Sequence, residues 1–415
     1  MIKKFDKNLA IMFFLGSTSG LPIALILSTL KALLSDKGFD LKTIGFFSLV
    51  SLTYTLKFFF APIIDSFGLP ILTKTFGQRR SWIIFSQIIL IIFISALGLV
   101  TISANLTAIA VLAFLVAFAS ASQDIVIDAY RIEIIKKEDQ GLAAGFYVYG
   151  YRIGMLISGA GALILADLIS WAAVYFIMAT FMLIGIITTF FADESRKEWQ
   201  QKKYSFDSWF KESVISPFVD FKNHQNWYII FAFIIFFKLG DAFAGNMTLP
   251  FLLELTFSKI EIASIVKSFG LFATLFGVFV GGVLVKKMGV NKSLWIAGIA
   301  QMISNLAFSY LSTKGHSIDT LYFIIFIENF SGGIGDSVFV VYLSSLCSFS
   351  FSATQYALLA SLATFARSTL SSFAGIFAES LGWYQFFILS TFLALPGLIF
   401  LSILTIKNTG LKKQN

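Results

Sequence analysis

The stretch ASASQDIVIDAYRIEIIKKEDQG, from Ala119 to Gly141, decides the fold. It begins inside a long apolar segment and carries Asp124, Asp128 and Arg131 at spacings of four and three, which places all three on one face of a helix. A charged side chain in hydrocarbon costs at least ~2.5 kcal/mol, so such residues usually pair or line a polar cavity. The stretch therefore predicts a membrane helix with a functional face.

The composition of the chain indicates a polytopic membrane protein. Of its 415 residues, 57% are hydrophobic and 13% are charged, and the mean hydropathy is +0.84, which is too apolar for a soluble chain. The basic residues behind the net charge of +8 lie in short loops between apolar stretches, so we expect no nucleic-acid partner. A single cysteine, Cys347, and two loop histidines, His224 and His316, argue against a disulfide framework, a histidine metal site and a catalytic triad. We expect no enzyme, no metal and no cofactor.

Apolar stretches long enough to cross about 30 Å of hydrocarbon recur twelve times. The first extends from Leu9 to Leu34 without a small-residue cleavage pattern, so we interpret it as a span and not as a signal peptide. The twelve predicted spans are 9–34, 43–66, 81–103, 106–132, 142–166, 171–192, 227–253, 261–285, 293–313, 318–345, 355–378 and 384–406. The predicted fold is an all-α polytopic membrane protein with twelve transmembrane helices in two six-helix halves, 1–192 and 227–415, joined by a linker, 193–226.

Basic residues in the loops predict the orientation. An even number of spans puts both termini on one side, and that side carries twenty lysines and arginines in its loops and ends, against four on the other. The positive-inside rule then predicts cytoplasmic termini. The polar segment 193–226 lies on the same side, either as a solvated linker or with an amphipathic helix on the membrane surface.

The two halves resemble each other at corresponding positions. The matched pairs are Gln140 with Gln355, Arg152 with Arg367, Asp167 with Glu379, and Trp171 with Trp383. The first two pairs share an offset of 215 and the other two an offset of 212. Two six-span halves in parallel repeat are the architecture of rocking transporters of the major facilitator type.

Charged residues of both signs recur at mid-span depth. They are Lys57, Arg152, Lys238, Asp241, Glu328, Asp336 and Arg367. We expect a central polar cavity, with purely structural ion pairs as the alternative, because buried pairs rarely stabilise a fold more than apolar packing does.

Roles for these groups follow from their depth and chemistry. Asp124 is the predicted coupling or substrate group, because burial and nearby cations act in opposite directions on a carboxylate. Arg131 reaches the interface, where it can snorkel to water and can pair with Asp128, so a gate or packing lock is the plain interpretation of these two residues. Asp241 follows Lys238 by three residues, so the alternative role for these two residues is to neutralise each other as an ion pair within one helix. Arginine or lysine at mid-span can hold a carboxylate.

Tyrosines and glycines complete the pattern. Tyr147 and Tyr151 share one helix face and suit either sugar rings or plain packing. Glycines cluster at 16–20, 154–161, 277–282 and 332–335, where we expect close helix contacts. The chain has no nucleotide-binding P-loop, which disfavours ATP-driven transport by this chain alone.

Several longer motifs resemble one family. They are SQDIVIDAYRIE (122–133), GYRIGMLISGAGALILAD (150–167), SGLPIAL (19–25), TLKFFFAPIID (55–65), KLGDAFAG (238–245), ENFSGGIGDSVFV (328–340) and ATQYALLASLATFARS (353–368). They touch both halves and are similar to the AmpG-type anhydromuropeptide permeases of the major facilitator superfamily. The resemblance implies proton-driven import of N-acetylglucosaminyl anhydro-N-acetylmuramyl peptides across the bacterial inner membrane, a step of peptidoglycan recycling.

The resemblance also implies roles for particular residues. The acidic residue of the family's span-four motif matches Asp124, preceded by Gln123. The loop after span two resembles the superfamily's cytoplasmic gating motif, with Asp65, Arg79 and Arg80 retained and Ser66 where a basic residue is common.

The sequence predicts a symporter that works as a monomer in the lipid bilayer. Its predicted substrate is a small glycopeptide, and its predicted driving force is the proton gradient. The predicted proton-coupling residues are Asp124, Asp128, Asp241 and Glu328; the substrate-binding residues are Gln123, Lys57, Tyr147, Tyr151, Arg152, Lys238 and Arg367; the gating residues are Asp65, Arg79, Arg80 and Arg131. The alternatives are a related carrier for another amphipathic anion such as acetyl-CoA, a membrane enzyme such as a lipid-linked glycosyltransferase, and a non-transporting receptor.

Overall fold

The structure, a computed structural model, describes residues 7–103, 105–196 and 205–406, and every regular element in these ranges is helical. The predicted all-α class is therefore confirmed. Both chain ends, which are predicted to be cytoplasmic, and residues 197–204 of the predicted linker lie outside the described residues.

The helices group into two compact units. The N-terminal unit comprises Met1–Lys137, Phe146–Phe218 and Cys347–Ser361, and the C-terminal unit comprises Glu138–Gly145, Val219–Leu346 and Leu362–Asn415. Two short segments thus group with the unit of the opposite half. They contain Gln140 and Gln355, the pair that the internal repeat aligns. The predicted boundaries at 192 and 227 stay a prediction.

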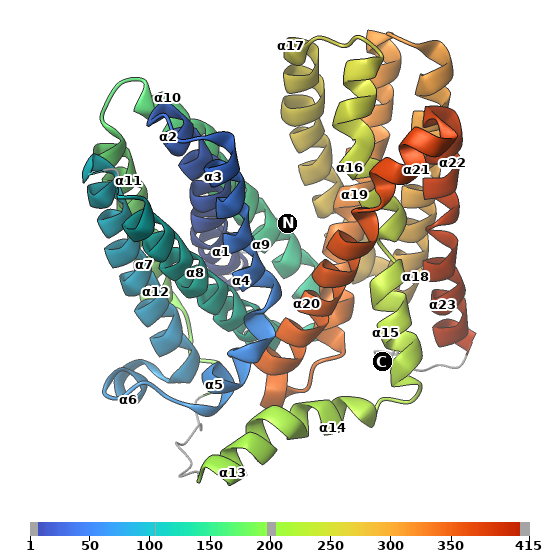
Figure 1. The fold of residues 1–415 in the computed structure, drawn as a ribbon. Helices are drawn as coiled ribbons and strands as arrows, with labels where there is room; N and C mark the ends of the chain where they lie inside the picture. The colour runs from blue at the N-terminus through green and yellow to red at the C-terminus, as the bar shows by residue number, and fades with distance from the viewer. Residues whose placement is uncertain (1–6, 104, 197–204, 407–415) are drawn as a thin grey trace, which may run out of the picture. The chain divides into compact units, whose positions relative to one another are not determined.

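The N-terminal unit is built from long apolar helices, several of them composite. Their bounds are α1 (Lys7–Ala24) continued by α2 (Leu30–Asp36); α3 (Leu41–Phe46), α4 (Leu52–Thr55) and α5 (Ala61–Ser66); α7 (Gln78–Ser103); α8 (Leu106–Ile134); α9 (Gln140–Leu156) continued by α10 (Ala162–Ala166); and α11 (Trp171–Phe181) with α12 (Leu183–Phe191). The first residues of α9, up to Gly145, group with the C-terminal unit. Within this unit α7 packs against α8 and α11, and α1 packs against α8 and α12 (Figure 1). Short α6 (Leu72–Phe76) connects α5 to α7.

Side-chain caps begin several of these helices. The Asn105 side chain accepts a hydrogen bond from the amide of Ala108 at the start of α8, and Ser170 does the same for Ala173 at the start of α11. Each cap satisfies one of the free N–H groups at a helix start. The Asn105 cap fixes where α8 begins and hence the position of Asp124 along this helix.

The C-terminal unit repeats the long-helix pattern. Its helices are α15 (Trp227–Phe236) with α16 (Leu239–Glu254), α17 (Lys259–Ile262), α18 (Gly270–Lys314), α19 (Ile318–Ser345), α20 (Ser352–Ser371) with α21 (Ala374–Leu381), and α22 (Trp383–Phe392) with α23 (Leu395–Ile406). The first residues of α20, up to Ser361, group with the N-terminal unit. Within it α18 packs against α19 and α22, and α15 packs against α23. A core of aromatic rings that includes Phe251, Phe308 and Phe387 joins these helices.

The described ranges contain nine helices long and apolar enough to span a membrane, or ten if the pair 42–55 and 57–66, bent by 41°, counts as one span. One of the nine, Lys259–Lys314, has 56 residues, far more than the roughly 20 needed for one crossing. Gly289 breaks it with φ 77° and ψ 166°, a conformation that glycine adopts without strain. The break lies between the predicted spans 261–285 and 293–313. The count of twelve spans stays a prediction.

The glycine clusters bring helix backbones into contact, as predicted. On α1, a Cβ at Gly16 would meet the carbonyl oxygen of Tyr147, and one at Gly20 that of Tyr151. On α9 the relation is reciprocal, since Gly150 faces the carbonyl of Phe13 and Gly154 that of Ser17. Gly277 on α18 and Gly333 on α19 make similar backbone contacts. Both crossings use small residues four apart, a common device for close packing in membranes.

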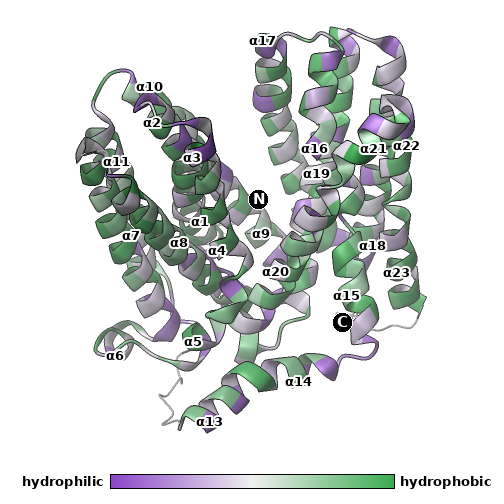
Figure 2. Ribbon diagram, viewed as in Figure 1, coloured by the Kyte–Doolittle hydropathy of each residue, from purple (hydrophilic) through white to green (hydrophobic). Residues whose placement is uncertain are grey.

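Hydrophobic residues cover most of each long helix, whereas hydrophilic ones concentrate toward helix ends and connections (Figure 2). Many large apolar side chains, such as Ile92 and Phe190, are exposed, which suits contact with lipid. Part of the predicted linker is also helical, as α13 (Phe206–Trp209) and α14 (Ser216–Lys222). Phe206 and Phe218 are exposed there. That this segment lies as an amphipathic helix on the membrane surface stays a prediction.

Candidate functional site

The face of α8 is buried as its spacing predicts. Asp124 and Asp128 are 7% and 6% exposed, and Arg131 is fully buried. The hydroxyl of Ser19, on α1, donates a hydrogen bond to Asp124 Oδ1 and lies 2.9 Å from the Tyr147 hydroxyl. The glycine crossing of α1 and α9 makes this arrangement possible, because it carries Ser19 and Tyr147 to the same point.

Asp128 occupies a different environment one turn along the helix. Its carboxylate lies 3.4 Å from Arg131 and 3.7 Å from Lys57. Lys57 reaches it from the bend between α4 and α5, where the helix tightens into a short 3₁₀ turn. Arg131 also lies over the ring of Tyr356, 5.5 Å from its centroid. The predicted pairing of Arg131 with Asp128 is therefore confirmed, whereas its fully buried side chain does not extend to water as snorkelling would require.

The other predicted substrate-binding groups of the N-terminal unit lie on α8 and α9. The rings of Tyr147 and Tyr151 lie 6.2 Å apart. Gln123 is fully buried, and its amide donates a hydrogen bond of 3.0 Å to the carbonyl of Thr18 on α1. Arg152 is half-buried and forms no ion pair with any described residue. Their roles in binding stay predictions.

The C-terminal unit holds a second set of charges. Lys238 lies at the junction of α15 and α16 and forms an ion pair with Asp336 on α19. Asp241, the partner predicted for Lys238, forms no ion pair with it within the described residues. Asp241 interacts electrostatically with Lys238, Asp336 and Arg367. Glu328 accepts a hydrogen bond of 2.7 Å from Asn329, whose own oxygen accepts one of 3.0 Å from Thr274.

Two of the predicted gating residues belong to a buried ion cluster. Arg79 lies 2.6 Å from Asp65 and 2.7 Å from Glu133, and Arg196 lies 2.8 Å from the same Glu133 carboxylate. The amide and hydroxyl of Thr354, in the segment 347–361 of the N-terminal unit, both donate to Asp65 at 2.8 Å. Burial lowers the pKa of the Arg196 guanidinium, the charge of Arg79 adds to this, and Glu133 and Asp65 oppose it.

Sequence reasoning missed Glu133, Arg196 and Thr354, although Glu133 ends the motif SQDIVIDAYRIE. Arg80, which the sequence predicted as a gating residue together with Arg79, forms no ion pair with the described carboxylates of this cluster. Its guanidinium donates to the carbonyls of Thr189 and Phe190 at 3.0 and 3.2 Å. It therefore caps the end of α12, as basic side chains often do at helix C-termini.

Glu133→Gln is expected to destabilise the protein by about 3 kcal/mol, because it leaves two buried guanidinium groups with the single carboxylate of Asp65 as their partner. The affected groups are Arg79 and Arg196, which share the Glu133 carboxylate. Thermal unfolding of the purified protein in detergent measures the effect. Glu138→Gln, at an exposed position five residues further along the chain, is the control; equal melting temperatures for the two variants would contradict the role assigned to the cluster.

Comparison with known proteins identifies the family. A family model described as Major Facilitator Superfamily matches residues 12–369. The chain belongs to this superfamily. Solved structures of major facilitator proteins share the fold: the human organic anion transporter MFSD10 has a TM-score of 0.72 at 14% identity, covering 95% of this chain and 99% of that one. The transporter FucP in its outward conformation has a TM-score of 0.66 at 12% identity, covering 95% and 97%.

Sequence relatives within the superfamily are closer. The anhydromuropeptide permease of Escherichia coli K12 is 40% identical over 396 residues, which cover 95% of this chain and 79% of the permease. The transporter AmpG 4 of Rickettsia conorii is 39% identical over 407 residues, 97% of each chain. The resemblance read from the motifs is thus confirmed. These relatives are transporters, so the transporter class is confirmed against the membrane-enzyme alternative.

Proposed function

We propose that this major facilitator protein imports anhydromuropeptides, N-acetylglucosaminyl anhydro-N-acetylmuramyl peptides, across the bacterial inner membrane. The observation that carries the proposal is the 40% identity to the Escherichia coli permease over 95% of the chain. The matched 396 residues make up nearly the whole chain, so the likeness extends over both halves. Transport proceeds by alternating access, with both termini in the cytoplasm and one chain as the working unit.

The proton gradient drives this import, and Asp124 carries the proton. The argument rests on its partners. Asp128 is committed to Lys57 and Arg131, whereas the hydrogen-bond partner of Asp124 is the hydroxyl of Ser19. A hydroxyl donates to a carboxylate and accepts from a carboxylic acid, so Asp124 can change its protonation state without breaking an ion pair. Asp241 and Glu328 are the candidates for a proton site in the C-terminal unit.

Cations that lack a carboxylate partner are the best candidates for binding an anionic substrate. Lys57 and Lys238 already form ion pairs with Asp128 and Asp336. Arg152 and Arg367 form none with the described residues, and a guanidinium binds a carboxylate through two hydrogen bonds. We assign the binding of substrate carboxylates to these two arginines. We assign the binding of sugar rings to Tyr147 and Tyr151, together with Gln123.

Uptake into cells tests the proposal. A bacterial strain without its own permease is complemented with this chain and given radiolabelled disaccharide tripeptide outside. Label is expected inside the cells, and a proton uncoupler is expected to prevent its accumulation. Membrane insertion is checked by immunoblotting. Well-inserted protein without uptake of label would overturn the proposal, and uptake of labelled acetyl-CoA instead would favour the alternative carrier.

A further inference from the structure

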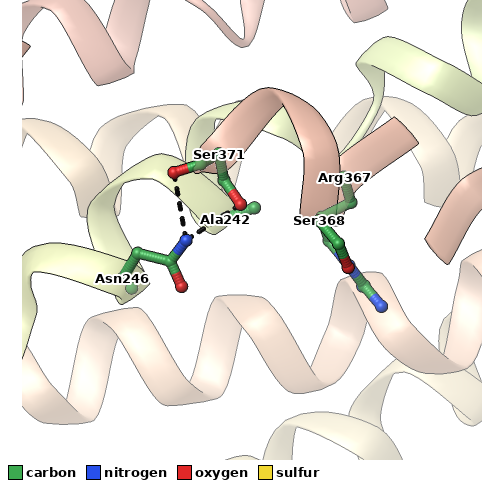
Figure 3. A pocket seen from close by; sticks show the side chains of 6 residues that line it. Ala242, Asn246, Arg367, Ser368 and Ser371 are labelled. Atoms are coloured by element: carbon green, nitrogen blue, oxygen red, sulfur yellow. Dashed lines mark hydrogen bonds between the residues drawn. The ribbon is translucent and has the colours of Figure 1, made fainter. Parts of the chain in front are cut away.

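A partly open cavity of about 340 Å³ lies between α16 and α20 in the C-terminal unit (Figure 3). Its lining comes from Ala242, Gly245 and Asn246 on α16 and from Arg367, Ser368 and Ser371 on α20. Arg367 is the single member of this lining among the predicted site residues. The other polar groups were not singled out by the sequence.

Two polar residues of the cavity, Asn246 and Ser371, are hydrogen-bonded to each other. The amide nitrogen of Asn246 donates to the backbone oxygen of Ser371 at 3.1 Å and to its hydroxyl at 2.9 Å (Figure 3). This pins the side chain and leaves its carbonyl oxygen as an acceptor toward a ligand. Across the cavity, Ser368 and Arg367 add a hydroxyl and a guanidinium. The cavity thus offers a strong donor group and one oriented acceptor.

Arg367 is the group that calls for an anion. It is half-buried at mid-span and forms no ion pair with the described residues. Asp241, one turn before Gly245, interacts electrostatically with both Arg367 and Lys238. An unpaired guanidinium at membrane depth is costly, and a bound carboxylate that accepts two of its N–H groups offsets that cost.

The size and lining of the cavity narrow the ligand further. At about 340 Å³ it lies at the small end of ligand pockets, which range over roughly 300–1,000 Å³. It therefore holds one end of a glycopeptide and not the whole molecule. None of the described residues that line it is aromatic, whereas sugar rings are commonly bound against aromatic faces. A peptide end supplies a carboxylate for Arg367 and an amide N–H for Asn246.

The geometry points to a subsite for the carboxylate-bearing end of the peptide stem, in the cavity between α16 and α20. This inference rests on the proposed function, since it specifies which part of the imported glycopeptide the C-terminal unit binds. Gly245, which also lines the cavity, offers a second position at which the subsite can be tested by substitution. A Cβ at this position would meet no atom within 4 Å, so a larger side chain enters the cavity without disturbing the backbone.

Paired probes test the subsite. One is labelled disaccharide tripeptide with free peptide carboxylates, and the other is the same molecule with those carboxylates amidated. The wild-type protein is expected to prefer the acid by about tenfold, since hydrogen bonds to charged groups are the stronger ones. Arg367→Gln is expected to bring the ratio of the two uptake rates close to one. Lys314→Gln, which removes an exposed charge at the end of α18, is expected to keep the wild-type ratio.

A second variant guards against a folding defect in the first. Gly245→Leu is expected to reduce uptake of the acid probe about tenfold by filling the cavity, with a melting temperature close to that of the wild-type protein. A wild-type preference that survives in both variants overturns the subsite and leaves the proposed function standing. If the well-inserted wild-type protein transports neither probe, the proposed function itself has failed.

Discussion

Asp124→Asn is expected to abolish proton-driven accumulation of substrate while the protein still exchanges substrate across the membrane. The asparagine amide can keep the hydrogen bond with Ser19 that Asp124 makes, so the local packing survives. It cannot gain or lose a proton at any accessible pH. The conformational cycle then continues, but no proton accompanies the substrate.

Reconstituted vesicles distinguish these two activities. With one proton per substrate in an electroneutral cycle, a gradient of one pH unit accumulates wild-type substrate about tenfold, because one pH unit is worth about 1.4 kcal/mol. The Asn variant is expected to show no accumulation and near-normal counterflow. Asp167→Asn, at an exposed carboxylate at the end of α10, serves as the control. Accumulation tenfold by Asp124→Asn would exclude this carboxylate as the proton carrier.

Features that depend on spacing along one helix were predicted well from the sequence. The four- and three-residue intervals from Asp124 to Arg131 placed these residues on one face, which is buried. Glycines four apart, such as Gly16 and Gly20, predicted close helix contacts, which the backbone contacts of α1 and α9 confirm. Helix periodicity fixes both, because 3.6 residues per turn relate side chains within one element.

Features that depend on a second helix were harder to predict. Lys238 has Asp241 three residues away in sequence but pairs with Asp336, 98 residues further on. Arg131 has a short path to the interface by sequence, yet packing against Tyr356 buries it. A single sequence gives the faces of each helix and not the pairing of faces, so partners of buried charges emerge only from the tertiary structure. The cluster of Arg79 with Glu133 and Arg196 is the clearest case.

Gly150→Val is expected to leave little folded protein. Any Cβ at Gly150 would collide with the carbonyl oxygen of Phe13 and approach the amide of Ser17 at 2.8 Å. These are backbone atoms, so no side-chain rotation relieves the collision, and α1 and α9 must separate. Overpacking of this kind typically costs about 1–3 kcal/mol and sometimes more. Separation also removes the hydroxyl contact of Ser19 with Tyr147 beside Asp124, so transport by the surviving protein should be lost.

The matched control for this prediction is Gly332→Val on α19, where a Cβ would meet no atom within 4 Å. Both substitutions place the same β-branched residue inside a helix, so effects of helix propensity largely cancel between them. Size-exclusion profiles and melting temperatures in detergent measure the difference. Gly332→Val is expected to elute and melt like the wild-type protein, and Gly150→Val to aggregate or melt several degrees lower. Equal behaviour would mean that the α1 and α9 backbones do not meet at Gly150, and the support this crossing gives to the Asp124 site would fall with it.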